Sequence, residues 1–263
     1  MERLNWLGHI GNTPVGGQGK TPKTYYLKQK GYEAILEHSG RSEEALGPFV
    51  RAHTGISWSP IMYHRLETVS VLIQMHLEAH ATDDLRLIGT RLEYVRTRVG
   101  GKLQSETTDR FQGHQSAGGS PTTVRIVPDA AFAIANISTG ARAVFFLELD
   151  RATEPITSSG RRNSIIGKFQ NYDAYMKSRK FRETYARWGE FKNFVCLFVT
   201  PEGRDGQHRR IENIRAASGD LDARLHPFYK LSSYESVTET FFHDGWYGRD
   251  PKDENRYRLV KSR

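Results

Sequence analysis

The chain has 263 residues, of which 37% are hydrophobic and 26% charged, with 24 glycines and 10 prolines. This composition excludes collagen, coiled coil and disordered linker, and the length suits one large domain or two small ones. Lysine and arginine outnumber aspartate and glutamate by 38 to 30, which is a net charge of +8 and favours an anionic partner, nucleic acid first.

The cellular compartment is indicated by cysteine usage and by the absence of long apolar runs. Cys196 is the single cysteine of the sequence, so an intrachain disulfide is excluded and a reducing cytosol is favoured. No window approaches the roughly 18 to 20 apolar residues of a membrane span, and the N-terminus lacks a signal-peptide core. We therefore expect a cytoplasmic protein without a membrane partner.

The first segment, residues 1–45, has the pattern of a partial winged helix. A short apolar piece, a turn rich in glycine and proline, a strand over 24–27 and a helical stretch ending at Gly40 follow one another. The loop 16–23 would be the wing and would carry Lys20 and Lys23 to a phosphate backbone. An ATP phosphate loop is the alternative for this segment, but the residues before it are a poor match to the buried apolar strand that such a loop needs.

The second segment, residues 46–104, predicts a helical connection. Apolar residues recur at helical spacing between 59 and 98, which predicts two helices. Residues 100–121 are rich in glycine and predict a turn-rich connection with strand pieces. Glu67 and Glu93, within the predicted helices, are further metal-ligand candidates, although acids on helix surfaces are usually solvated.

The third segment, residues 105–235, predicts an α/β domain followed by a mobile polar tail over 236–263. The expected order is three strands at 124–129, 130–134 and 143–150, a helix at 164–187, a strand at 191–199, a helix at 209–217 and a short strand at 228–231. Strands with continuous apolar runs are typical of a sheet that is covered by helices on both faces.

Three carboxylates mark the ends of two neighbouring strands in this domain. Asp129 precedes one strand, and Glu148 and Asp150 end the next, where a period of two places both on the same face. Acids brought together in this way repel unless a hard cation such as Mg²⁺ or Mn²⁺ neutralises them. The sequence therefore predicts a metal site made by Asp129, Glu148 and Asp150 that can activate water and hold a phosphate.

These motifs resemble a known family. Pro128-Asp129, Glu148-Leu149-Asp150 and the stretch from Lys168 to Tyr172 are similar to the plasmid replication-relaxation family and, more broadly, to the PD-(D/E)XK nuclease superfamily. The resemblance implies a restriction-endonuclease-like fold, that is, a mixed sheet flanked by helices. It also implies a double-stranded DNA substrate and metal binding by Asp129 and Glu148.

Asp150 departs from the superfamily pattern, which usually has lysine at this position. A carboxylate cannot stabilise the charge of an attacking hydroxide as an ammonium does. Lys168, on the following helix, is the best substitute, and Gln170 and Tyr172 would position the phosphate. Asp129, Glu148, Asp150 and Lys168 are thus the predicted catalytic residues.

The same helix carries an excess of positive charge. Eight basic residues stand against two acidic ones between Arg161 and Arg187. The predicted DNA contacts are Arg161, Arg162, Lys177, Arg179, Lys180 and Arg182. The interleaved aromatic residues are expected to pack mostly into the core.

The sequence thus predicts a Mg²⁺- or Mn²⁺-dependent DNA endonuclease or nickase that acts in plasmid or mobile-element maintenance. The alternative is a DNA-binding replication or copy-control protein that does not cleave, because lysine is replaced at Asp150. A homodimer and plasmid replication or mobilisation proteins are the further partners considered.

Overall fold

The computed structural model falls into two compact units, Met1–Tyr63 and His64–Arg263. The residues that the structure describes are 7–10, 24–40, 42, 49, 60–113, 122–158, 164–203, 208–242 and 244–260. The predicted wing with Lys20 and Lys23, and the predicted contacts Arg161 and Arg162, lie outside these ranges.

The first unit contains a hairpin followed by a helix. β1 (Leu7–Ile10) pairs antiparallel with β2 (Thr24–Leu27), and α1 (Gln29–Ser39) follows. The helix ends at Gly40, whose φ of 63° is a left-handed conformation that glycine adopts at low cost. The order of strand, strand and helix agrees with the sequence pattern, and the assignment as a winged helix stays a prediction.

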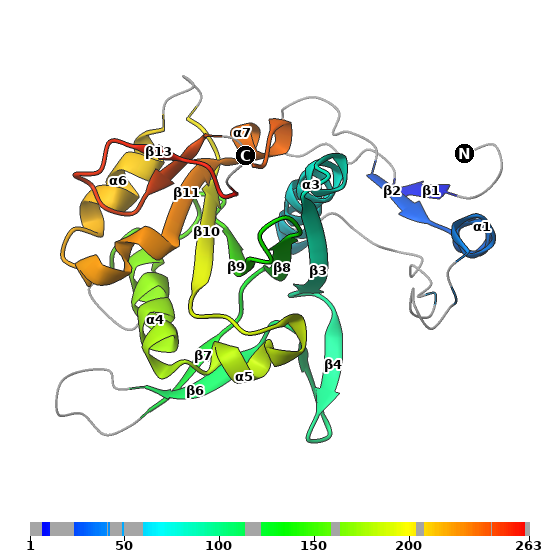
Figure 1. Ribbon diagram of the computed structural model, residues 1–263, viewed down its shortest axis with the longest axis horizontal. Helices are drawn as coiled ribbons and strands as arrows, with labels where there is room; N and C mark the ends of the chain where they lie inside the picture. The colour runs from blue at the N-terminus through cyan, green and yellow to red at the C-terminus, as the bar shows by residue number, and fades with distance from the viewer. Residues whose placement is uncertain are drawn as a thin grey trace. The chain divides into compact units, whose positions relative to one another are not determined.

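The second unit is built on a mixed seven-stranded sheet in the order β13-β12-β11-β10-β9-β8-β3 (Figure 1). The strands are β3 (Leu85–Leu92), β8 (Ala130–Asn136), β9 (Arg142–Leu149), β10 (Phe194–Thr200), β11 (Tyr229–Ser233), β12 (Trp246–Gly248) and β13 (Arg256–Tyr257). β8 pairs antiparallel with both β3 and β9, whereas β9, β10 and β11 are mutually parallel. The predicted mixed α/β class is therefore confirmed.

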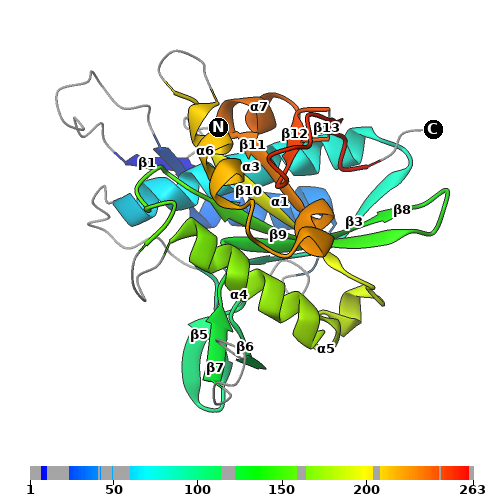
Figure 2. The same cartoon turned by 90° about the vertical axis from the view of Figure 1, so that its left-hand side faces the viewer.

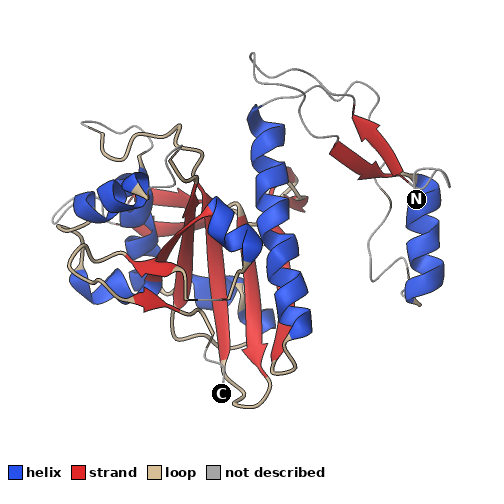
Figure 3. Ribbon diagram, turned by 90° about the horizontal axis from the view of Figure 1, so that it is seen from above, coloured by secondary structure: helices blue, strands red, loops and turns tan. Residues whose placement is uncertain are grey.

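Helices cover both faces of this sheet (Figure 3). α3 (Pro60–Ala81) and α7 (Tyr234–Glu239) lie on one face. The other face is covered by α4 (Ile165–Ser178), α5 (Phe181–Thr184), α6 (Arg209–Ala217) and the 3₁₀ turns η2 (Ala186–Trp188) and η3 (Ala223–Phe228).

Alternation along β9 divides the core into two layers. The Phe145 ring stacks on Phe132 in the cluster that contains Val71 of α3. Phe146 points to the opposite face and contacts the ring of Tyr172 on α4. Because β9 is buried on both faces, its sequence is a continuous apolar run, and Glu148 stands out as a charge within it.

The predicted second helix between 59 and 98 is wrong. The first helix is confirmed as α3, but residues 85–92 form β3, which pairs antiparallel with β8. Leu85 and Leu87 are two residues apart and so fit a strand as well as a helix, and pairing with the apolar β8 decides between the two.

Two hairpins follow β3 and account for the strand pieces predicted in the turn-rich connection. β4 (Arg96–Val99) pairs with β5 (Lys102–Ser105), and β6 (Asp109–Gly113) pairs with β7 (Thr122–Ile126). β7 therefore belongs to a separate two-stranded sheet, whereas its sequence had been expected to lead directly into the main sheet.

Two further expectations are corrected at the C-terminal side of the unit. The helix predicted over 164–187 ends at Ser178, because Arg179 adopts a left-handed φ of 58°. The expected polar tail contributes α7, β12 and β13, and its Trp246 is fully buried. Large apolar side chains within a polar segment were the signal that this segment joins the core.

Candidate functional site

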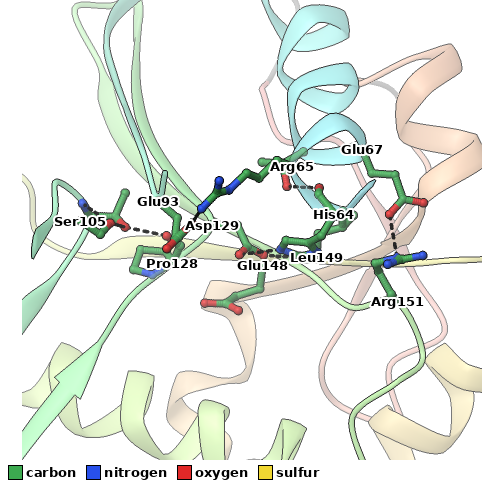
Figure 4. Close-up of polar contacts among 12 residues, drawn as sticks. His64, Arg65, Glu67, Glu93, Ser105, Pro128, Asp129, Glu148, Leu149 and Arg151 are labelled. Carbon is green, nitrogen blue, oxygen red and sulfur yellow. Dashed lines mark hydrogen bonds and ion pairs between the residues drawn. The ribbon is translucent and has the colours of Figure 1, made fainter. Parts of the chain in front are cut away.

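Asp129 is held in place at the start of β8 by two hydrogen bonds. Its Oδ2 accepts the backbone N–H of Leu149 at 2.7 Å, and its Oδ1 lies 2.9 Å from Nε2 of His64 on α3 (Figure 4). The first bond ties Asp129 to the end of the neighbouring strand β9, and the second ties it to the helix that covers this face. The orientation of the carboxylate is therefore set by two separate elements.

Glu148 lies beside Asp129 and is buried. Ala130 pairs with Leu147 in the antiparallel ladder of β8 and β9, so Asp129 and Glu148 occupy the next positions on the two strands. The Glu148 side chain is 6% exposed. Its Oε1 accepts a hydrogen bond from the Tyr172 hydroxyl, and its Oε2 accepts one from Lys168 Nζ at 3.2 Å.

Lys168 reaches the site from the first turns of α4. Ser164 caps this helix by accepting the backbone N–H of Gly167, which directs the first turn towards the end of β9. The ammonium also forms an ion pair with Glu154 at 3.0 Å, and its side chain remains 28% exposed. Lys168 thus lies on the helix that follows the strand and contacts Glu148, and its catalytic role stays a prediction.

The charges of this cluster shift the pKa values of its members. Burial, together with the charge of Asp129, raises the pKa of Glu148 to about 7. The hydrogen bond to Asp129 raises the pKa of His64 above its ordinary value, although burial opposes it. Burial lowers the pKa of Lys168, but Glu148 and Glu154 outweigh burial, so the net shift is upward and the ammonium stays charged.

Asp150 belongs to a different network. Its buried carboxylate accepts hydrogen bonds from Arg210 Nε of α6 and from the backbone N–H of Ala152, and it lies 3.4 Å from the Thr200 hydroxyl. These contacts link the end of β9 to α6 and β10. Within the described ranges, no group of three or more histidine, cysteine, aspartate or glutamate side chains is arranged to hold a metal ion.

Glu67 and Glu93, the two further metal-ligand candidates, are engaged with arginines in the structure. Glu67 pairs with Arg151 at 3.1 Å, and Glu93 lies 3.7 Å from Arg65 (Figure 4). The partial exposure of these side chains is typical of surface ion pairs, which contribute little to stability.

Sequence reasoning missed His64, Glu154 and Arg210 as members of the two networks. A signal for His64 was available, because His64 stands one turn before the buried stripe of α3 that contains Thr68 and Val71. A polar residue at the end of a buried stripe is placed to face the sheet. No comparable pattern marks Glu154 or Arg210.

The predicted DNA contacts on α4 and after it have mixed environments. Gln170 and Arg179 are exposed, whereas Tyr172 is 2% exposed and its hydroxyl contacts Glu148. The remaining three have partners at the surface: Lys177 pairs with Asp222, Lys180 pairs with Glu183, and Arg182 donates to the Lys192 carbonyl. The aromatic residues between them are buried, as expected.

The comparison with family models identifies residues 1–189 as a match to the replication-relaxation model. The chain belongs to the replication-relaxation family. The match includes Asp129, Glu148 and Lys168 and ends before β10, and membership suggests a role in replication or relaxation. No curated protein and no solved structure matches the chain. Every helix in the described part of the chain is too short or too polar to cross a bilayer.

Proposed function

We propose that the chain is a divalent-metal-dependent DNA endonuclease or nickase that acts in the replication or maintenance of a plasmid or other mobile element. The observation that carries the proposal is the 3.2 Å contact between Lys168 Nζ and Glu148 Oε2. The superfamily that the sequence resembles usually has lysine where this chain has Asp150. Here α4 delivers an ammonium to the buried acid of the motif, which supports the same chemistry from a different element.

The donor set fits a hard cation. Asp129 and Glu148 lie side by side on paired strands and offer carboxylate oxygens, which retain lone pairs beyond the hydrogen bonds they accept. Mg²⁺ is commonly held by one or two carboxylates together with substrate phosphates and waters, so two protein ligands are sufficient. When bound there, Mg²⁺ or Mn²⁺ would polarise the scissile phosphate and lower the pKa of a water molecule.

The surrounding residues have distinct roles in this proposal. His64 and the Leu149 amide orient Asp129, and the Tyr172 hydroxyl orients Glu148. The partly exposed Lys168 ammonium can meet a phosphate oxygen and stabilise charge that develops on it. Tyr172 is thus a positioning residue here and not a phosphate contact.

The exposed side of α4 and the turn after it would seat the DNA backbone. Gln170 and Arg179 are exposed there, and the surface ion pairs of Lys177 and Lys180 are weak enough to exchange for phosphate. The restriction-endonuclease-like fold is part of the same proposal, supported by a mixed sheet with helices on both faces.

The test is incubation with supercoiled plasmid in Mg²⁺, in Mn²⁺ and in chelator. We expect conversion to open-circular or linear DNA in either metal and none in chelator. Asp129→Asn and Glu148→Gln should remove cleavage and leave DNA binding intact. Lys168→Met should reduce cleavage, while Lys252→Met, the same change at an exposed lysine outside the proposed site, should not. Cleavage retained by both acid variants would refute the assignment.

A second candidate is a DNA-binding replication or copy-control protein that does not cleave. It is favoured by the burial of Asp150 against Arg210, which removes one of the three predicted metal ligands. In this case wild-type protein would bind DNA in a salt-sensitive manner and leave plasmid intact in both metals. The same plasmid assay therefore separates the two functions.

A further inference from the structure

The two hairpins between β3 and β8 carry an unusual distribution of charge. Arg96, Arg98 and Lys102 are exposed on β4 and β5, and Arg110 and Arg125 are exposed on β6 and β7. Asp109, whose carboxylate accepts the Tyr175 and Thr184 hydroxyls, is the one acidic residue of these four strands and is 9% exposed. Arg96 pairs with Glu93 at 3.6 Å at the base of the first hairpin, and the other solvent-facing charges of the four strands are positive without intervening acids.

The β6–β7 ladder brings two of these charges together. Arg110 and Arg125 are directly paired across the two strands, and both are exposed. Like charges directly opposite one another destabilise a strand pair. A surface that keeps such a pair is stabilised when an anion lies between the guanidinium groups. A shallow hollow of about 410 Å³ lies beside Arg110 and is also lined by Lys180 and Gln112.

The β4–β5 hairpin is a tight ribbon. Val99 pairs with Lys102, so the connection has two residues, Gly100 and Gly101, with φ of 55° and 80°. Positive φ at both positions is the requirement of a two-residue turn whose twist matches the strands. The Arg98 guanidinium donates to the Gly101 carbonyl, which fastens this arginine to the turn. A side chain fixed in this way loses less entropy when it binds a partner.

The hairpins are anchored at the candidate site. The Glu93 N–H donates to the carbonyl of Asp129 at 2.9 Å, and the Thr107 hydroxyl donates to the Pro128 carbonyl at 2.7 Å. Figure 4 shows Glu93, Ser105 and Pro128 beside Asp129. Beyond this anchor the β4–β5 ribbon has strands of four residues, which span roughly 13 Å.

We infer that the β4–β5 and β6–β7 hairpins are two arms that bind the backbone of duplex DNA on the side of the Asp129 site. Both arms lie on the lower side of the molecule in Figures 1 and 2, where in Figure 1 the β4–β5 arm points downward and the β6–β7 arm runs toward the left. The major groove admits a two-stranded β-ribbon, and alternate residues on a strand are about 6.7 Å apart, close to two phosphate steps of 3.4 Å. The choice of DNA as the partner rests on the proposed function, and the new element of the inference is the surface that binds the DNA.

The test compares two triple variants of equal charge. Arg96→Gln/Arg98→Gln/Lys102→Gln removes the cations of the first arm, and the control Arg86→Gln/Lys192→Gln/Lys252→Gln removes three exposed cations elsewhere. Fluorescence anisotropy with a labelled duplex of about 30 base pairs measures affinity across a salt series. We expect the arm variant to lose about tenfold or more in affinity, and the slope of log affinity against log salt concentration to become shallower by about two to three. The control should lose about twofold in affinity at most.

The second arm is tested by Arg110→Gln/Arg125→Gln, which should also weaken DNA binding. This variant should raise the melting temperature slightly in the absence of DNA, because it removes a like-charge pair. A thermal melt of each variant establishes that the fold is retained. Affinity and salt slope equal to those of the control in both arm variants would overturn the inference.

The outcomes also separate this inference from the proposed function. Cleavage by wild type together with unaffected binding by both arm variants would overturn the arms alone. Weakened binding by the arm variants together with intact plasmid in both metals would support the arms and overturn the nuclease. A wild-type chain that binds no duplex DNA would overturn both.

Discussion

α4 carries two buried clusters of the same composition, each with a carboxylate, a cation and a tyrosine hydroxyl. Glu148 meets Lys168 and Tyr172 at one end, and Asp173 meets Arg249 and Tyr229 further along. The environments differ. Lys168 is 28% exposed and lies near a second acid, Asp129, whereas Arg249 is fully buried and also donates to the Asp222 carbonyl.

This difference shows how a candidate functional site differs from an ion pair that only stabilises the fold. The Asp173–Arg249 pair is buried and bonded to groups of the fold itself, and it fastens the C-terminal segment to α4. The Glu148–Lys168 pair has an accessible ammonium and a neighbouring acid that raises the pKa of Glu148. Access to solvent and an excess of negative charge leave the Glu148–Lys168 cluster able to receive a cation and a phosphate.

The largest expected effect on stability is at the buried Asp173–Arg249 pair. Arg249→Met leaves Asp173 charged and buried, so we expect the free energy of unfolding to fall by about 3 to 5 kcal/mol. Urea denaturation measures this change. The double variant Asp173→Asn/Arg249→Met should recover part of the loss because no unpaired charge remains. A single variant as stable as wild type would mean that the pair does not hold the C-terminal segment.

The second prediction concerns Lys168, where we expect a small loss of stability and a large loss of cleavage. Lys168→Met should cost less stability than Arg249→Met, about 1 to 2 kcal/mol, because Glu148, whose pKa is about 7, can take up a proton when the ammonium is lost. Cleavage should fall by about 10²- to 10³-fold, as expected for a group that stabilises transition-state charge. Plasmid nicking and a urea melt on the same preparation test both statements. A large loss of stability with normal cleavage would mean that Lys168 has a structural role like that of Arg249.

Lys230 sharpens the comparison because its pKa shifts in the direction opposite to that of Lys168. Burial lowers the pKa of Lys230 to about 8 in the folded state, against 10.5 for an ordinary lysine. Between these values the unfolded chain binds more protons, so this residue makes stability rise as the pH increases from about 8 to about 10.5. Relative to Lys230→Met, wild type should gain up to about 3 kcal/mol over that window.

Urea melts across this pH range test the prediction, with Lys252→Met as a control on an exposed lysine. The difference between wild type and Lys230→Met should change with pH, and the corresponding difference for the control should not. A difference independent of pH would mean that the ammonium of Lys230 is solvated as well in the folded chain as in the unfolded one.

The smallest effect is expected at Lys177. Its 3.0 Å pair with Asp222 lies on the same helix as both clusters, but the lysine side chain is 55% exposed. Lys177→Met should change the free energy of unfolding by less than about 1 kcal/mol and, because it removes a single phosphate contact, lower plasmid cleavage by about threefold at most. A melt and a plasmid assay measure the two quantities. A larger loss would show that surface pairs on α4 matter as much as the buried ones.

Local patterns predicted much of the fold correctly. The apolar runs of β8, β9 and β10 and the helix α6 lie where the sequence indicates them, because burial on both faces leaves a continuous apolar signature. The prediction was wrong for β3, where leucine spacing fits two periods, and at Arg179, where a left-handed residue ends α4 early. Pairing across the sheet and local backbone geometry decided these cases.

By itself, the sequence determined that Asp129 and Glu148 end neighbouring strands, that Asp150 follows on the same face, and that the chain is basic. Only the tertiary structure decided which cation meets which acid. From the sequence, either Lys168 or Arg210 could pair with an acid at the end of β9. The packing of α4 and α6 against the sheet places Lys168 at Glu148 and Arg210 at Asp150. Strand periodicity is a local property, whereas charge pairing depends on contacts between segments far apart in the chain.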